Sequence, residues 1–225
     1  IYRFAKWLLG LSLPAFLLFI ILMGAAFAAV MGSIGGLSGN YANIQGSGTT
    51  INEYSPYVIK YAQMYGIEPA YIYATMEAES DFRPNLVSSA GASGLLQVMP
   101  VTFEHAKQLM KADGEKDDGY TYADIFEPEV NIKYAVRYFK YLKETFPKAT
   151  IKTRAAAYNA GPGSVQGWLS NPAYSSDGVN LIYDNIPYAE TNAYVKKIEQ
   201  LFEKYSKMDG INSTTHSGGI GNQGV

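Results

Sequence analysis

The pattern of apolar and polar residues divides the chain into an apolar segment, two polar segments and a long amphipathic region. Residues 8–31 carry no charged side chain and span about 24 residues, enough to cross a hydrocarbon core of about 30 Å at about 1.5 Å per residue. Residues 32–52 and 209–225 are rich in Gly, Ser, Asn and Thr. The pattern predicts one folded domain, residues 53–208, between the two polar segments.

Within this domain, apolar residues recur at helical spacing. One face of the segment 131–146 is formed by Ile132, Ala135, Val136, Phe139 and Leu142. Asn131 stands before them as a predicted N-cap. The same pattern predicts helices over residues 53–65, 69–81, 101–112, 131–146, 151–159, 163–170 and 189–206. No clear pair of alternating strands appears, so the predicted fold class is all-α.

The apolar N-terminal segment predicts a membrane location. Arg3 and Lys6 precede it and no positive charge follows closely, so the positive-inside rule places the N-terminus in the cytoplasm and the domain outside. We interpret residues 1–31 as a single transmembrane anchor, residues 32–52 as a flexible tether and residues 209–225 as a linker or disordered tail. A cleavable signal peptide is the alternative, because Ala26-Phe27-Ala28 has the A-x-A form.

Composition excludes several classes of function. The formal net charge of −2 argues against a nucleic-acid partner, which requires a basic surface. The absence of cysteine excludes disulfides and thiol nucleophiles. His105 and His216 have no neighbouring Cys, His or carboxylate at metal-binding spacing, so no metal or other cofactor is predicted.

The candidate chemistry begins at Glu79. Pro69 marks the first turn of a predicted helix that should end before Pro84, because the residue that precedes a proline is pushed out of the helical region. Glu79 then lies in or near the last turn, where the carbonyl end of the helix disfavours a second negative charge and raises a carboxyl pKa. A glutamic acid that stays protonated near neutral pH can act as a general acid.

Four ordered blocks of sequence extend this observation. They are Glu79-Ser80 with Phe82 and Pro84; Ser88 with GASGLLQVMPVT from Gly91 to Thr102; AYNAGPGSV from Ala157 to Val165; and Pro187-Tyr188, Glu190-Thr191 and Tyr194-Val195. Together they resemble the catalytic domain of the soluble lytic transglycosylases, the Slt-like branch of the lysozyme superfamily, which cleaves bacterial peptidoglycan. Leu96 and Phe103 depart from the usual family residues, and both are apolar exchanges that affect local packing.

The resemblance implies a lysozyme-like fold and a reaction that needs one carboxyl group. In this family the acid protonates the glycosidic oxygen between N-acetylmuramic acid and N-acetylglucosamine. The resulting carboxylate then takes the proton of the sugar's C6 hydroxyl, and a 1,6-anhydro ring closes without water. Glu77 and Asp81 lie two positions from Glu79, on other faces of the helix, and are expected to be structural or solvated.

The resemblance also implies further site residues. Tyr158 corresponds to a family tyrosine close to the acid and is the second candidate for a catalytic role. The expected substrate-binding residues are Ser88, Gln97, Met99, Asn159, Tyr188, Glu190 and Tyr194. Gly161-Pro162-Gly163 should end one helix and start the next. The expected partner is the peptidoglycan of a bacterial cell wall, reached from the membrane, for wall remodelling or for a secretion, conjugation or phage machine.

Two other functions compete with this one. A hydrolytic muramidase on the same fold would need a second carboxylate, which a polar loop at residues 114–122 and its flanks can supply from Asp113, Asp117, Asp118 or Asp124. A non-catalytic wall-binding module is the other alternative, and the intact Glu79 argues against it. A second polar loop, residues 171–185, is expected to cover the substrate cleft.

Overall fold

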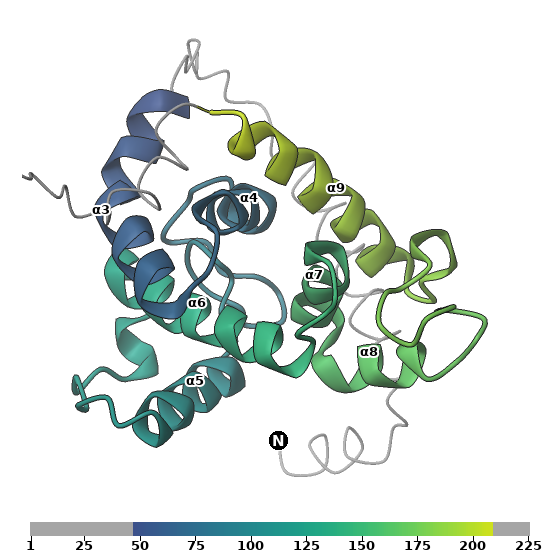
Figure 1. Ribbon diagram of the computed structural model, residues 1–225. Coiled ribbons are helices and arrows are strands. Elements are labelled where there is room, and N and C mark those ends of the chain that lie inside the picture. Colours follow the sequence, from purple (N-terminus) through teal and green to yellow (C-terminus); the bar gives the residue numbers. More distant parts are fainter. Residues whose placement is uncertain (1–46, 209–225) are drawn as a thin grey trace, which may run out of the picture.

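The computed structural model describes residues 47–208, with side chains from Glu53 onward, and this part of the chain is helical (Figure 1). The α-helices are α3 (Ser47–Tyr65), α4 (Pro69–Ser80), α5 (Pro100–Ala112), α6 (Pro128–Thr145), α7 (Ile151–Ala160), α8 (Pro162–Leu169) and α9 (Ala189–Ser206), and the 3₁₀ turns are η1 (Tyr122–Asp124) and η2 (Tyr183–Asn185). Between residues 47 and 208 the β-structure is limited to isolated bridges of Ser93 with Val87 and with Val98. The predicted all-α class is confirmed for this region.

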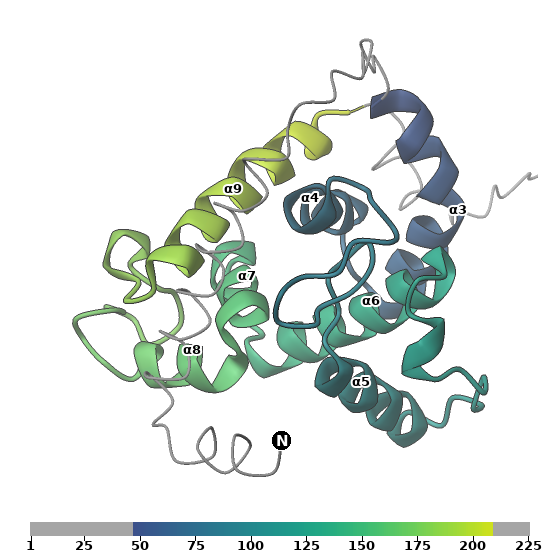
Figure 2. The ribbon, with the colours of Figure 1, turned by 180° about the vertical axis from the view of Figure 1, so that it is seen from behind.

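Helix α4 lies at the centre of the described domain. Figure 1 shows it nearly end-on, with α3, α6, α7 and α9 around it, and the view from behind gives the same arrangement (Figure 2). Helix α9 packs along α4 and α7, α3 packs on α6, and α5 and α8 pack on the outside, on α6 and α7. Helix α4 therefore lies among helices that come from both halves of the chain (Figure 1).

The core consists of two apolar clusters. The larger cluster draws its buried residues mainly from α3, α4, α5 and α6 and includes the wholly buried Leu96 and Phe103. The smaller cluster joins the end of α6 to α7, α8 and the 171–188 loop, which contributes Leu181 and Ile186. Tyr158 packs against both clusters. Helix α7 thus places Tyr158 at the seam between them.

Prolines set the starts of several helices. The chain has proline in the first turn of α4, α5, α6 and α8, where the missing N–H has no intrahelical partner to lose. Gly161, with φ of 85°, ends α7 and precedes the first residue of α8. The predicted helix break at Gly161-Pro162-Gly163 and the predicted end of α4 before Pro84 are both confirmed.

Two predictions at helix ends are wrong. Helix α3 begins at Ser47, so the helical domain starts before residue 53 and includes part of the predicted tether. Extending a formed helix costs less than nucleating one, which lets a poor helix-forming sequence join it. Asn131 is not an N-cap, because α6 begins at Pro128 and Glu127 occupies the cap position. Asn131 is instead buried, with 1% exposure.

The predicted membrane anchor (residues 1–31), the first part of the tether (32–46) and the tail (209–225) lie outside the described residues. Among residues 47–208, no helix has both the length and the apolar character that crossing a bilayer requires. The second polar loop, residues 171–185, packs against the smaller cluster, and the N–H of Leu181 donates a hydrogen bond to the Thr153 hydroxyl at 3.2 Å. Whether this loop covers a substrate remains a prediction.

Candidate active site

Glu79 is the penultimate residue of α4, where the chain leaves the helix sharply. Asp81 and Phe82 both take the left-handed conformation, with φ of 51° and 58°, so the chain turns back over the end of the helix. The buried hydroxyl of Ser80 donates to the Leu95 carbonyl at 2.7 Å. The first sequence block is therefore tied directly to the second block beside the candidate acid.

A buried amide holds the second block in place. The N–H of Leu96 donates to Asn131 Oδ1 at 2.8 Å, and Asn131 Nδ2 donates to the carbonyls of Ser93 and Ile125 at 2.9 and 3.0 Å. Gly94 lies so close that a Cβ there would stand 2.1 Å from Asn131 Nδ2. The glycine and the asparagine together fix the turn that carries Leu96 and Gln97.

The surroundings of Glu79 make its carboxyl a weak acid. Burial raises the pKa of Glu79 to about 7, and the negative charge of Glu190 acts in the same direction. The Tyr194 hydroxyl and the positive charge of Lys197 oppose them. The raised pKa agrees with the sequence prediction, and its leading cause is burial of the carboxyl. At neutral pH both protonation states are populated.

Tyrosine side chains surround this carboxyl. Burial, followed by the charge of Glu79, raises the pKa of both Tyr158 and Tyr194 well above the usual value, so both hydroxyls keep their protons near neutral pH. Tyr158 donates its proton to the Leu96 carbonyl at 2.7 Å. Tyr194 lies close enough to lower the pKa of Glu79, although the pair does not reach hydrogen-bond geometry. The buried hydroxyl of Tyr71 also interacts electrostatically with Glu79.

One face of α9 supplies groups of three different kinds. Glu190, Tyr194 and Lys197 follow one another at spacings of four and three residues, which places them on the same helical face. Lys197 Nζ donates to the Ala78 carbonyl at 2.8 Å. Neither Lys197 nor Tyr71 was among the predicted site residues. The spacing from Tyr194 is a sequence signal for Lys197, whereas nothing in the sequence distinguished Tyr71 from other core tyrosines.

The side chains of the predicted residues Ser88 and Gln97 hold their own loop together, and Met99 lies at its end. The Ser88 hydroxyl accepts a bond from the Ala92 N–H at 3.0 Å. Gln97 Nε2 donates to the carbonyls of Leu86 and Gly94 at 3.0 and 2.9 Å. Met99 is the N-cap residue of α5. The bonds of Ser88 and Gln97 give the loop a defined shape next to the Ser80–Leu95 hydrogen bond.

The remaining predicted residues lie on α7 and at the start of α9. Asn159 Oδ1 accepts a bond from the Thr191 hydroxyl at 2.6 Å, which joins these two helices. Tyr188 is 46% exposed and its ring meets the edge of Trp168, with centroids 5.0 Å apart. Glu190 is exposed and acts on Glu79 through its charge. Of the predicted site residues, Tyr194 and Glu190 act on the pKa of Glu79, and the charge of Glu79 acts on the pKa of Tyr158.

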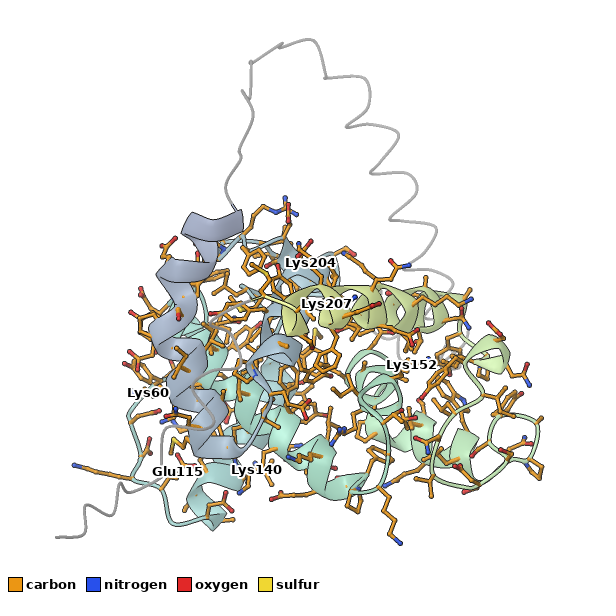
Figure 3. All side chains as sticks on the ribbon, turned by 45° about the horizontal axis from the view of Figure 1, so that its top comes forward. Lys60, Glu115, Lys140, Lys152, Lys204 and Lys207 are labelled. Atoms are coloured by element: carbon orange, nitrogen blue, oxygen red, sulfur yellow. The ribbon has the colours of Figure 1, made fainter. Side chains whose placement is uncertain are left out.

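The other acidic residues considered from the sequence have partners elsewhere. Glu77 accepts bonds from Tyr205 and from Lys204, the latter at 2.7 Å, so its predicted structural role is confirmed. Figure 3 labels Lys204 on α9. On the α5–α6 side, the ion pairs join Asp113 to Arg137 and Lys140, Asp117 to Lys107, and Asp118 to Lys133, while Asp124 caps η1. Within the described residues, Glu190 is the carboxylate whose charge acts on Glu79.

The protein resembles known lytic transglycosylases in sequence. The family model "Transglycosylase SLT domain" matches residues 56–179. The chain is 35% identical over 145 residues to the soluble lytic murein transglycosylase of Salmonella typhimurium, covering 64% of this chain and 22% of that protein. It is 33% identical over 170 residues to membrane-bound lytic murein transglycosylase C of Actinobacillus pleuropneumoniae, covering 68% and 46%.

Solved structures give the same result. The 70 kDa soluble lytic transglycosylase of Escherichia coli matches with a TM-score of 0.60 and 32% identity, covering 72% of this chain and 25% of that one. An inactive glutamate-to-glutamine mutant of lytic transglycosylase Slt from Pseudomonas aeruginosa matches with a TM-score of 0.57 and 27% identity, covering 68% and 24%. The chain thus spans less than half of the length of these relatives. It belongs to the transglycosylase SLT domain family and has the lysozyme-like, all-helical fold of that family.

Proposed function

We propose that this domain is a peptidoglycan lytic transglycosylase that cleaves the β-1,4 bond between N-acetylmuramic acid and N-acetylglucosamine and leaves a 1,6-anhydro end. The observation that carries the proposal is one partly buried glutamate, Glu79, whose pKa of about 7 lets it donate a proton and take one back at neutral pH. The relatives named as lytic murein transglycosylases support the same activity.

In the proposed reaction Glu79 acts twice. Its carboxyl proton goes to the glycosidic oxygen as the bond from the muramic acid C1 breaks. The C6 hydroxyl oxygen then bonds to C1, and its proton passes to the Glu79 carboxylate, which restores the acid. No water is consumed, so no second carboxylate is needed to activate one. Attack within one sugar ring gains from proximity, which compensates for the absence of a second catalytic side chain.

Neighbouring side chains have distinct proposed roles. Tyr158 and Tyr194 keep their protons at neutral pH, and Tyr158 fixes the Leu96 carbonyl beside the acid. We assign contacts with sugar hydroxyls and acetamido groups to Ser88, Gln97, Met99, Asn159, Tyr188, Glu190 and Tyr194, on the strength of the family resemblance. The hydrogen bonds within the loop favour a rigid binding surface, because these side chains are already held before substrate arrives.

The cellular setting is also part of the proposal. The apolar residues 8–31 and the membrane-bound relatives support an anchor in residues 1–31, with the domain on the cell-wall side of a bacterial membrane. A tether ending near Ser47, where α3 begins, would let the domain reach glycan strands. From this location the domain could open the wall locally for a secretion, conjugation or phage machine.

Mass spectrometry of the products tests the proposal. The full chain, kept in detergent because of its apolar N-terminal segment, is incubated with purified peptidoglycan beside Glu79→Gln and the control Glu104→Gln, which replaces an exposed glutamate on α5. We expect anhydro-muramyl products from the unchanged protein and the control, and none from Glu79→Gln. Reducing-end products, heavier by one water, would contradict the proposal and make Glu190 the second carboxylate of a hydrolase. An absence of products from all three proteins would favour a binding module.

A further inference from the structure

Lys197 of α9 contacts the backbone of α4 next to Glu79. Its Nζ donates at 2.8 Å to the carbonyl of Ala78, the residue before Glu79. That carbonyl belongs to the last turn of α4, where the carbonyl groups have no intrahelical donor. The lysine therefore gives the Ala78 carbonyl a hydrogen-bond donor and holds the end of α4 at a fixed distance from α9.

The position of Lys197 on α9 gives it a second property. Glu190, Tyr194 and Lys197 occupy one face of the helix, with the carboxylate toward its N-terminus and the ammonium group one turn beyond the tyrosine. Glu190 and Lys197 act on the Glu79 carboxyl with opposite sign. Both side chains are exposed, whereas the tyrosine hydroxyl between them is buried. The candidate acid is thus placed against one negative and one positive charge.

The other charged groups near α4 do not replace this lysine. Lys204, also on α9, binds Glu77 on another face of α4. Arg154 of α7 acts on the Tyr71 hydroxyl. Asp81 follows α4 as its C-cap residue, and Tyr158 of α7 and Tyr194 of α9 are neutral at physiological pH. Among the residues that the structure describes, Lys197 is the cation whose charge acts on Glu79.

We propose that Lys197 is a positioning residue for Glu79, which holds the last turn of α4 through the Ala78 carbonyl and keeps a positive charge beside the carboxylate. This inference rests on the proposed function, because it concerns the state that Glu79 reaches after it has given its proton away. Burial alone disfavours that anion. A nearby cation stabilises it, so that the same residue can serve as base in the second half of the reaction.

Direct titration of Glu79 tests the inference without relying on activity. The full chain in detergent is labelled with ¹³C at the glutamate carboxyl carbon, and the Glu79 signal is identified by its loss in Glu79→Gln. Titrations compare the unchanged protein with Lys197→Met, Lys197→Gln and Lys197→Arg. Lys196→Met is the matched control, because it removes a neighbouring exposed lysine that pairs with Asp184 at 3.3 Å.

We expect the Glu79 midpoint to move to higher pH by about half a unit in Lys197→Met and Lys197→Gln, the size that an exposed charge pair produces. Lys197→Arg and Lys196→Met should titrate like the unchanged protein, and Glu190→Gln should move the midpoint the other way. The shift in Lys197→Met should shrink in about 1 M salt, where the Debye length is about 3 Å. If Lys197 were only a structural tether, the midpoint would stay unchanged in Lys197→Met and Lys197→Gln.

An unchanged midpoint in both charge-removing variants, or an equal shift in Lys196→Met, would overturn the inference. The product assay separates this failure from that of the proposed function. If the unchanged protein releases anhydro products while Lys197→Met titrates normally, only the role of Lys197 is wrong. If the midpoint moves as expected and no anhydro product forms, Lys197 still tunes Glu79, but the reaction assigned to that site is wrong.

Discussion

Replacing Glu79 by Gln should stabilise the protein, and the gain should depend on pH. The pKa of this carboxyl is about 7 in the folded protein against a model value of 4.5, so the folded state keeps a proton that the unfolded state has already released. A raised folded pKa contributes stability that is fully present below about pH 4.5 and is lost as the pH rises through about 7. A glutamine side chain does not ionise in this pH range, so the Glu79→Gln protein does not lose this stability as the pH rises.

The magnitude follows from the size of the shift. The difference between about 7 and 4.5, at about 1.36 kcal/mol per unit, corresponds to about 3 kcal/mol between acid and alkaline conditions. Folded domains typically have an unfolding free energy of about 5–15 kcal/mol, so this difference is a large part of the total. A partly buried carboxyl with a raised pKa thus lowers the stability of the protein at neutral pH, as expected where function competes with stability.

Urea unfolding measures the effect. Free energies of unfolding are obtained for the unchanged protein, Glu79→Gln and the exposed control Glu104→Gln at about pH 4 and about pH 8.5, on either side of both pKa values. The free energy of unfolding of Glu79→Gln, relative to the unchanged protein, should increase by about 3 kcal/mol from about pH 4 to about pH 8.5. The corresponding difference for Glu104→Gln should stay constant. An advantage that does not change with pH would refute the argument that burial sets the pKa of Glu79.

Three further substitutions test the packing around the site. Asn131→Ala removes three buried hydrogen bonds, each worth about 1–1.5 kcal/mol. Urea unfolding should show that the free energy of unfolding falls by about 3–4.5 kcal/mol, and a fall of less than about 1 kcal/mol would contradict this role of Asn131. Gly94→Ala, with φ of +80° and a Cβ 2.1 Å from Asn131 Nδ2, should lower the melting temperature and the activity together, and normal values for both would show that the turn tolerates a side chain. Glu77→Gln should cost about 1–2 kcal/mol through its bonds to Lys204 and Tyr205 while the pH profile of activity keeps its shape, and a displaced profile would place Glu77 in the site.

Local features of the sequence were sufficient for most of the helices. Apolar residues at helical spacing, proline in a first turn and glycine after a last turn act within a few residues, and α4 to α9 lie within a few residues of their predicted ranges. The errors occurred where a local signal had more than one use. Asn131 has the chemistry of a cap, but the fold uses its amide to bind three backbone groups of two loops.

The sequence by itself determined the helical class, the family resemblance of the four blocks and the identification of Glu79 as the candidate acid, because these depend on residue types at short spacing. Only the tertiary structure decided what surrounds that carboxyl. Lys197 lies 119 positions from Ala78, and the three side chains that act on the pKa of Glu79, those of Glu190, Tyr194 and Lys197, all come from α9. Such proximity is set by packing between distant segments, and no periodicity along the chain records which faces meet.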